Sequence, residues 1–179
     1  FDTLTNNKKI KNKISFVGSL LRFGKERSLD TVIKAFSSPK LKDYQLSIVG
    51  GPDTEVEKIR KVLSDKNISN IVITGRLQRN EVVKELQTSS VGLLINSPDR
   101  HSKYFTSPLK YFEYLASGLK VVAVDYPSHR VLPNQENIFY FQNDENSLIE
   151  SVKKAFDSEF NEINLEKISL NSRAKKIIE

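Results

Sequence analysis

Short runs of apolar, often β-branched residues alternate with longer segments of helical period along almost the whole chain, and this alternation restricts the possible folds most. Several runs are apolar at consecutive positions, as expected of strands buried on both faces of a parallel sheet. The amphipathic segments between them supply the crossover helices that such a sheet needs. The runs predicted as strands are 14–17, 45–49, 70–74, 91–95, 120–124 and 138–141.

The segments between these runs carry helix signals. The first places four apolar residues on one stripe at helical spacing, namely Leu29, Val32, Ile33 and Phe36. The others cover 54–63, 80–87, the stretch between Pro108 and Gly118, 145–156 and 164–179. The alternation predicts an α/β fold with a doubly wound, Rossmann-like parallel sheet of about six strands and helices on both faces.

The composition fits one domain of this kind. A chain of 179 residues with 38% hydrophobic residues can bury a real core, and without Cys it has no disulfide or thiolate site. We find no apolar span for a membrane and no signal-peptide pattern. The absence of Met indicates a fragment of a longer polypeptide. We therefore expect residues 1–13 to be a linker from an upstream domain and 14–179 to be one domain.

The charge pattern bears on partners. The net charge of +6 comes from basic residues that are scattered, so we expect solvated helix faces and no nucleic-acid partner. His101 and His129 are the only imidazoles, and neither has Cys, Asp or Glu at metal-ligand spacing. We predict neither a metal site nor a cofactor. No catalytic residue can be assigned from the sequence.

Nearly every predicted strand ends in glycine or small polar residues. The sequences Gly18-Ser19, Gly50-Gly51-Pro52, Gly75-Arg76 and Asn96-Ser97-Pro98 follow four of them. Each alone is explained by turn chemistry, since glycine permits positive φ and proline stops a strand. Together they would line the crevice at the carboxyl ends of the strands with bare backbone, where ligands of doubly wound sheets bind.

A phosphate group would have to be bound by something other than the known glycine-rich phosphate-binding motifs. The first strand is followed only by Gly18 and Gly24, and there is no Walker lysine loop. The start of the helix after Ser107 and Pro108 is one candidate, because the amides of Leu109 and Lys110 lie at the positive end of its macrodipole. The alternative is that Ser107 simply caps its own helix.

The same helix carries an acid beside the base. Glu113 is three residues after Lys110 and therefore adjacent to it on the helix surface. Glu113 is either a surface partner of Lys110 or the acceptor of hydrogen bonds from a ribose diol. We assign the apolar face of this helix to four other residues, namely Leu109, Phe112, Leu115 and Ala116.

Arg27 precedes the helix that follows the first strand, so it stands near the same crevice. It is placed to reach a phosphate there. An exposed arginine in a loop is, taken alone, more often solvated.

At this point the residues resemble a known family. The stretch "TSPLKYFEYLASGLKVVAVD" resembles the nucleotide-sugar signature of retaining group 1 glycosyltransferases, in the C-terminal domain of their GT-B fold. The likeness continues in order from "ISFVGSL" to "ISLNSRAKKIIE", and "FDTL" resembles the end of the interdomain linker. The signature helix is fairly specific, whereas the glycine loops are not.

The resemblance implies a role for each matching position. Glu113 would bind the ribose of the donor, and Arg76 and Leu77 would contact the base. The diphosphate would be held by Gly18, Ser19, Arg27, Ser107, Pro108, Leu109 and Lys110.

Three positions depart from the family pattern. Ser28 replaces a usual glycine, Ser19 replaces a basic residue, and Phe105 stands where an earlier glutamate near the donor sugar is often found. Arg22 or Lys25, in the longer first loop, are candidates to compensate.

The resemblance implies a donor-binding domain that works with an acceptor domain. The whole enzyme would move a hexose or hexosamine from a UDP or GDP sugar to a glycan or lipid-linked acceptor bound by a missing N-terminal domain. Such an enzyme is expected in the cytoplasm, including the inner face of the membrane as a peripheral protein, in polysaccharide biosynthesis. The isolated fragment should bind nucleotide weakly and turn over poorly. Two alternatives stay open, a GT-B-like nucleotide-sugar 2-epimerase and an inactive nucleotide-binding module.

Overall fold

The computed structural model describes residues 8–22, 24–106 and 108–163. Ser107, predicted to cap a helix and to touch the diphosphate, lies outside the described residues. The predicted terminal helix over 164–179 and the first seven residues of the predicted linker lie outside them as well.

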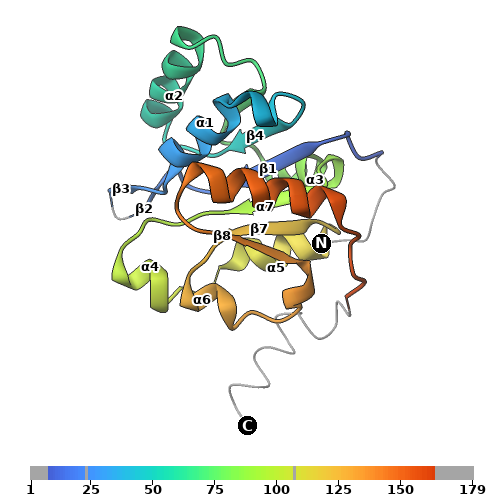
Figure 1. The fold of residues 1–179 in the computed structure, drawn as a ribbon. Coiled ribbons are helices and arrows are strands. Elements are labelled where there is room, and N and C mark those ends of the chain that lie inside the picture. The colour runs from blue at the N-terminus through green and yellow to red at the C-terminus, as the bar shows by residue number, and fades with distance from the viewer. Residues whose placement is uncertain (1–7, 23, 107, 164–179) are drawn as a thin grey trace.

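The core of the fold is a six-stranded parallel sheet with the order β5-β4-β1-β6-β7-β8 (Figure 1). The strands follow the predicted runs to within a residue or two, which confirms the doubly wound fold. They are β1 (Lys13–Val17), β4 (Gln45–Val49), β5 (Ile71–Gly75), β6 (Val91–Leu94), β7 (Lys120–Val124) and β8 (Ile138–Phe141).

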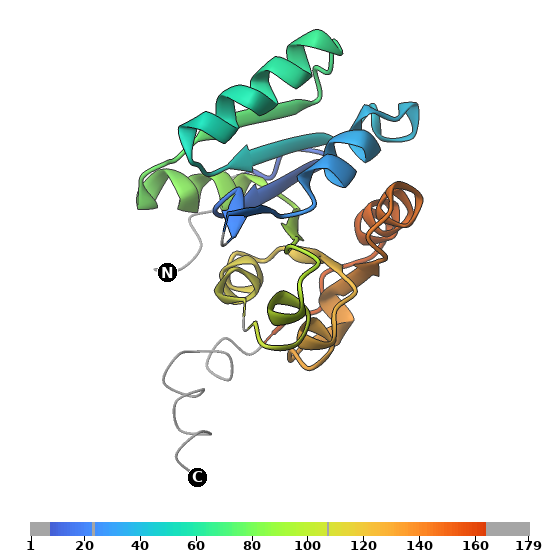
Figure 2. The ribbon, with the colours of Figure 1, turned by 90° about the vertical axis from the view of Figure 1, so that its left-hand side faces the viewer.

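Helices cover both faces of the sheet, as predicted, with α1 and α7 on one side and α3 and α5 on the other (Figure 2). The longer helices are α1 (Leu29–Ser37), α2 (Asp53–Asp65), α3 (Arg79–Thr88), α5 (Leu109–Ala116) and α7 (Glu145–Asp157). The short ones are α4 (Arg100–Tyr104), α6 (Pro127–Arg130) and the 3-10 turns η1 (Pro39–Leu41) and η2 (Gln135–Asn137).

In most strands alternate residues enter two separate apolar cores, whereas β5 buries one face only and leaves Val72 exposed. In β1, Ile14 and Phe16 pack with α1, α2 and α7, whereas Val17 packs with α3 and α5. All four residues of the stripe predicted for α1 are buried in the first core. Burial on both faces explains why the strands read as continuous apolar runs.

Two features differ from the sequence prediction. A small hairpin of β2 (Leu21–Arg22) and β3 (Lys25–Glu26) follows β1, and strands this short leave no readable period. The apolar face assigned to α5 is correct at Leu115, which is buried, and wrong at Leu109, which is 60% exposed. Tyr111 and Tyr114, which were not assigned to that face, are buried together with Leu115.

No helix within the described ranges has both the length and the apolar character to cross a membrane.

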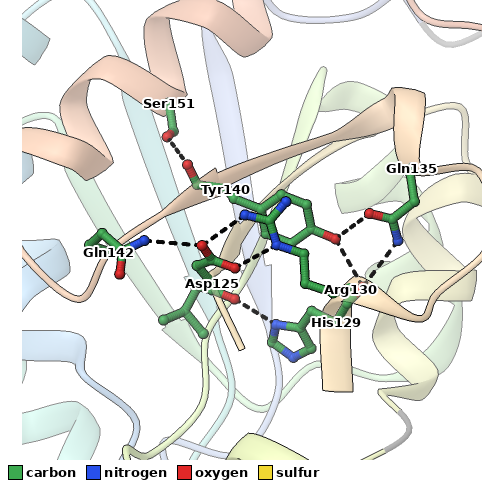
Figure 3. Close-up of polar contacts among 8 residues, drawn as sticks. Asp125, His129, Arg130, Gln135, Tyr140, Gln142 and Ser151 are labelled. Carbon is green, nitrogen blue, oxygen red and sulfur yellow. Dashed lines mark hydrogen bonds and ion pairs between the residues drawn. The ribbon is translucent and has the colours of Figure 1, made fainter. Parts of the chain in front are cut away.

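A polar network joins the ends of β7 and β8 (Figure 3). The guanidinium of Arg130 donates to both carboxylate oxygens of Asp125, at 2.6 and 2.8 Å, and its Cζ lies 3.8 Å from the ring centroid of Tyr140. His129, on α6, is fully buried beside this network, and its Nδ1 lies 2.7 Å from the carbonyl oxygen of Val124. His129 is therefore a packed core residue.

The buried imidazole predicts a pH-dependent stability. Burial lowers the pKa of His129, against the opposing effects of the Val124 carbonyl and the Asp125 charge. Because the folded-state pKa is below the unfolded one, stability is complete above about pH 6.5 and declines as the pH falls through that value, by up to about 1.4 kcal/mol per unit. His129→Asn, which keeps an N–H donor for Val124, should remove this part of the slope.

Urea unfolding of both proteins between about pH 5 and pH 7 measures the difference. His101→Asn is the matched control, since it removes an exposed imidazole and leaves His129 in place. Equal slopes in the parent chain and the His129→Asn variant would contradict the prediction.

Candidate functional site

The strand order reverses between β1 and β6, which locates the crevice at the carboxyl ends of these strands. The two strands pair only through Ile14 with Val91 and Ser15 with Gly92, whereas β1 and β4 pair over five residues. Beyond Ser15 the strands are therefore no longer held by their own ladder, and the crevice opens there.

Main-chain hydrogen bonds join the loops after β1, β4 and β5. The amide of Gly18 donates to Val49 O at 3.0 Å, and that of Gly50 donates to Gly75 O at 2.8 Å. A pocket of about 290 Å³ opens over these loops. Its lining brings together four residues predicted from the sequence, Gly18, Ser19, Arg76 and Leu77, with Val49, Gly50, Gly51 and Val82.

Two glycines of this pocket, Gly50 and Gly51, make close contacts, whereas a Cβ on Gly18 would meet nothing nearer than 3.4 Å. A Cβ on Gly50 would lie 1.8 Å from Gly18 O, and the residue has φ +154°. A Cβ on Gly51 would lie 2.9 Å from Nε of Arg76, so that side chain crosses directly over the backbone. The floor of the pocket is therefore main chain, as the strand-end glycines predicted.

Tyr114 fills the gap between β1 and β6. Its hydroxyl accepts a hydrogen bond from the amide of Val17 at 3.0 Å and donates to Leu93 O at 3.3 Å. Its ring packs where Gly92 has no side chain. Sequence reasoning missed Tyr114, although a glycine inside an apolar strand is a signal of close approach by another group.

Arg27 lies on the open side of the same crevice. Its Nη1 donates to Oδ1 of Asn96, a buried residue at the end of β6, at 3.3 Å. Burial lowers the pKa of Arg27, and the nearby Arg22 charge lowers it further. Nη2 of Arg22, in the hairpin, lies 3.3 Å from Nδ1 of His101 on α4. The guanidinium groups of Arg22, in the hairpin, and of Arg27, just after it, are thus close enough to interact.

Arg27 and Glu113 act on the same phenol. Burial raises the pKa of Tyr114, the Glu113 carboxylate raises it further, and the Arg27 guanidinium opposes this. The predicted phosphate residue and the predicted ribose residue thus both affect the pKa of Tyr114.

The side chains at the start of α5 face each other. Nζ of Lys110 lies 2.5 Å from Oε2 of Glu113, and the two side chains are 35% and 27% exposed. Pro108 occupies the N-cap position and is buried, while Leu109 begins the helix. In the structure Glu113 therefore has the ion-pair partner that the sequence alternative named.

The predicted residues form two groups. Gly18, Ser19, Arg76 and Leu77 line the pocket, whereas Arg27, Pro108, Leu109, Lys110 and Glu113 are not among its described lining residues. The second group gathers around Tyr114 and the start of α5. The two groups share β1 and its loop, since the Tyr114 hydroxyl binds Val17, next to Gly18.

A second hollow, of about 390 Å³, lies beside α5. Phe105, the residue in place of a family glutamate, is 67% exposed at its rim. The hollow is otherwise lined by Tyr104, Thr106, Phe112, Ser128, Val131, Leu132 and Pro133, without a carboxylate among the described residues. Within the described ranges no group of three or more potential ligands could hold a metal ion.

Solved glycosyltransferases share this fold. The chain superposes on a mutant of S. aureus TarM in complex with fondaparinux, alpha-GlcNAc-glycerol and UDP, with a TM-score of 0.70 and 16% identity over 98% of the chain and 36% of TarM. The pneumococcal O-GlcNAc transferase GtfA, in complex with UDP and GlcNAc, superposes with a TM-score of 0.56 and 16% identity, over 92% of the chain and 30% of GtfA. WaaG, a glycosyltransferase involved in lipopolysaccharide biosynthesis, superposes with a TM-score of 0.59 and 18% identity, over 82% of the chain and 38% of WaaG.

The chain thus spans about a third of the length of these proteins, which have the GT-B fold. No curated protein matches it by sequence. The family model described as glycosyl transferases group 1 matches residues 11–158, which is most of the chain. The chain therefore belongs to the group 1 glycosyltransferases.

Proposed function

We propose that this chain is the donor-binding domain of a retaining glycosyltransferase. The enzyme moves a hexose or hexosamine from a UDP or GDP sugar to a glycan or lipid-linked acceptor. Residues 14–179 form the donor domain, and 1–13 link it to an N-terminal domain that binds the acceptor. The whole enzyme works in the cytoplasm, including as a peripheral protein at the inner membrane face. The observation that carries the proposal is the pocket beyond the carboxyl ends of β1, β4 and β5, whose lining includes Gly18, Gly50 and Gly51.

The pocket and the helix start divide the nucleotide between them. The base lies against Arg76 and Leu77, and the diphosphate extends from the Gly18–Ser19 loop towards Arg27 and the first amides of α5. The small pocket and its bare backbone support this placement, because they let a ligand approach closely.

Glu113 changes partner when the donor binds. In the structure its carboxylate neutralises Lys110. A diphosphate beside Lys110 takes over that role, and Glu113 then accepts hydrogen bonds from the ribose diol. The exposure of both side chains permits this exchange, since neither is locked in the core.

The reaction breaks the bond between the anomeric carbon and the diphosphate oxygen and forms a bond to the acceptor hydroxyl on the same face. Arg27, Lys110 and the positive end of α5 stabilise the charge that develops on the leaving diphosphate. The diphosphate departs with the bonding electrons, and its leaving oxygen takes up the proton that the acceptor hydroxyl loses.

Nucleotide titration of the 179-residue chain tests the proposal. UDP or GDP should shift the amide NMR resonances of Leu109, Lys110, Gly18 and Ser19. A chain that binds neither nucleotide at millimolar concentration would be an inactive module, and the proposal would be wrong.

Glu113→Gln gives a sharper result. The variant should bind the preferred nucleoside diphosphate about 10-fold more weakly, because hydrogen bonds to a charged acceptor are worth about 1.5–3 kcal/mol. Its thermal midpoint should change little, since Glu113 is outside the buried face of α5. Isothermal titration calorimetry measures the affinity.

Glu57→Gln is the matched control. Glu57 also forms an ion pair three residues along a helix, with Nη1 of Arg60 at 2.6 Å, but it lies on α2 and outside the pocket lining. It should leave nucleotide affinity unchanged. Equal affinity of the Glu113→Gln variant and the parent chain would exclude the ribose role.

A further inference from the structure

We infer that Tyr114 is a positioning residue whose hydroxyl sets the separation of β1 and β6 at the switch point, and so places the Gly18–Ser19 loop against the start of α5. The inference rests on the proposed function, because it concerns the geometry of the nucleotide crevice.

The first support is the replacement of a backbone contact by a side chain. In a parallel sheet the amide of Val17 and the carbonyl of Leu93 would be satisfied by facing strands. Here both are bonded to one phenolic oxygen, at 3.0 and 3.3 Å. The hydroxyl therefore acts as a spacer between strands that pair no further than Ser15 and Gly92.

The second support is the space reserved for the ring. A Cβ on Gly92 would lie 2.4 Å from Cγ and Cδ2 of Tyr114. The tyrosine is fully buried, and its hydroxyl reaches the middle of the sheet from a helix on one face. Any side chain at Gly92 would displace the ring, so the glycine and the tyrosine form one unit.

The third support is the position of Tyr114 on α5. It follows Glu113 directly and lies four residues after Lys110, one helical turn along the same face. The hydrogen bond to Val17 ends one residue before Gly18. A single side chain therefore connects the two parts of the proposed site, the glycine loop after β1 and the charged start of α5.

The positioning role extends to the charges. Burial raises the pKa of the Tyr114 phenol, and the Glu113 carboxylate and the Arg27 guanidinium then act on that pKa in opposite directions. If the hydroxyl is removed, the Val17 amide loses its acceptor in a buried position, and the strands must shift or admit water to satisfy it. Either response moves the Gly18–Ser19 loop relative to Lys110 and Glu113.

Tyr114→Phe tests this with the ring kept in place. The variant should bind UDP, or GDP if UDP does not bind, about 10-fold more weakly than the parent chain. The amide resonances of Gly18 and Ser19 should also be displaced in the free protein. Calorimetry and NMR titration on the 179-residue chain provide both readouts.

Tyr111→Phe is the matched control. Tyr111 is also fully buried on α5, and its hydroxyl also donates to a backbone carbonyl, that of Pro133. Tyr111→Phe loses the hydrogen bond to Pro133, and Tyr114→Phe loses those to Val17 and Leu93, so both variants should lower the thermal midpoint. Only Tyr114→Phe should weaken nucleotide binding. Equal nucleotide affinities of the two variants would overturn the inference and leave Tyr114 as a purely structural residue.

A measurement on the parent chain tests the same inference without a substitution. Bound nucleotide should perturb the amide of Leu94, whose peptide group carries the Leu93 carbonyl bonded to Tyr114. An unperturbed Leu94 amide beside strongly perturbed Gly18 and Ser19 amides would also overturn the inference. If the parent chain binds neither UDP nor GDP, the proposed function itself is wrong, which is a separate outcome.

Discussion

Gly50→Ala should destabilise the chain by about 3–5 kcal/mol, the largest effect we expect from any single methyl group. The added Cβ would lie 1.8 Å from the carbonyl oxygen of Gly18, which is backbone and cannot rotate away. The loop after β1 and the loop after β4 would have to separate, although both are tied by hydrogen bonds to β4 and β5. Urea unfolding followed by circular dichroism measures the loss.

Gly75→Ala separates steric overlap from backbone strain. Gly75, the last residue of β5, also has a positive φ, +81°, but a Cβ there would meet nothing within 4 Å. It should cost only the strain of a left-handed conformation, about 1 kcal/mol. If the two variants were equally destabilised, the contact between Gly50 and Gly18 would not be the cause.

Gly92→Ala should cost about 2–3 kcal/mol, because its Cβ would overlap the ring of Tyr114 in the second core. The cost depends on one partner, so a double-mutant cycle identifies it. In a Tyr114→Ala background the ring atoms are absent, and Gly92→Ala should then be nearly neutral. Denaturant unfolding of the four proteins gives the coupling energy. A coupling near zero would mean that some other contact excludes a side chain at Gly92.

The sheet could be predicted almost completely from the sequence because of burial on both faces. A strand such as β7 is buried at each of its five positions, so its sequence KVVAV is apolar after its first residue and has no polar alternation. Asp144 precedes the helix predicted over 145–156, and in the structure its carboxylate accepts a hydrogen bond from the amide of Ser147 at 2.9 Å.

The apolar face of α5 was predicted only in part, because tyrosine is ambiguous: Leu115 was assigned to that face and the two buried tyrosines were not. Its ring is apolar and its hydroxyl is polar, so it suits a surface as well as a core when a partner for the hydroxyl exists. Tyr111 and Tyr114 find such partners in the carbonyls of Pro133 and Leu93. These partners are distant in sequence, and no local pattern announces them.

The candidate site was predictable in its glycines and its charged pair, but not in its centre. Gly18 and Gly50 predict loops, and the spacing of Lys110 and Glu113 predicts a contact between their side chains. The bond between Arg27 and Asn96 joins residues 69 positions apart, and only the fold creates it. The same is true of the hydroxyl of Tyr114 between two strands.

The ion pair between Lys110 and Glu113 has a consequence for how ligands compete at the start of α5. A carboxylate tethered 2.5 Å from the ammonium group acts as a built-in rival for any anion that approaches from solution. Added salt weakens the rival together with the incoming anion. Affinity for a diphosphate should therefore fall less steeply with ionic strength than the count of cations around it would suggest, and a simple anion without a diol gains little from displacing Glu113.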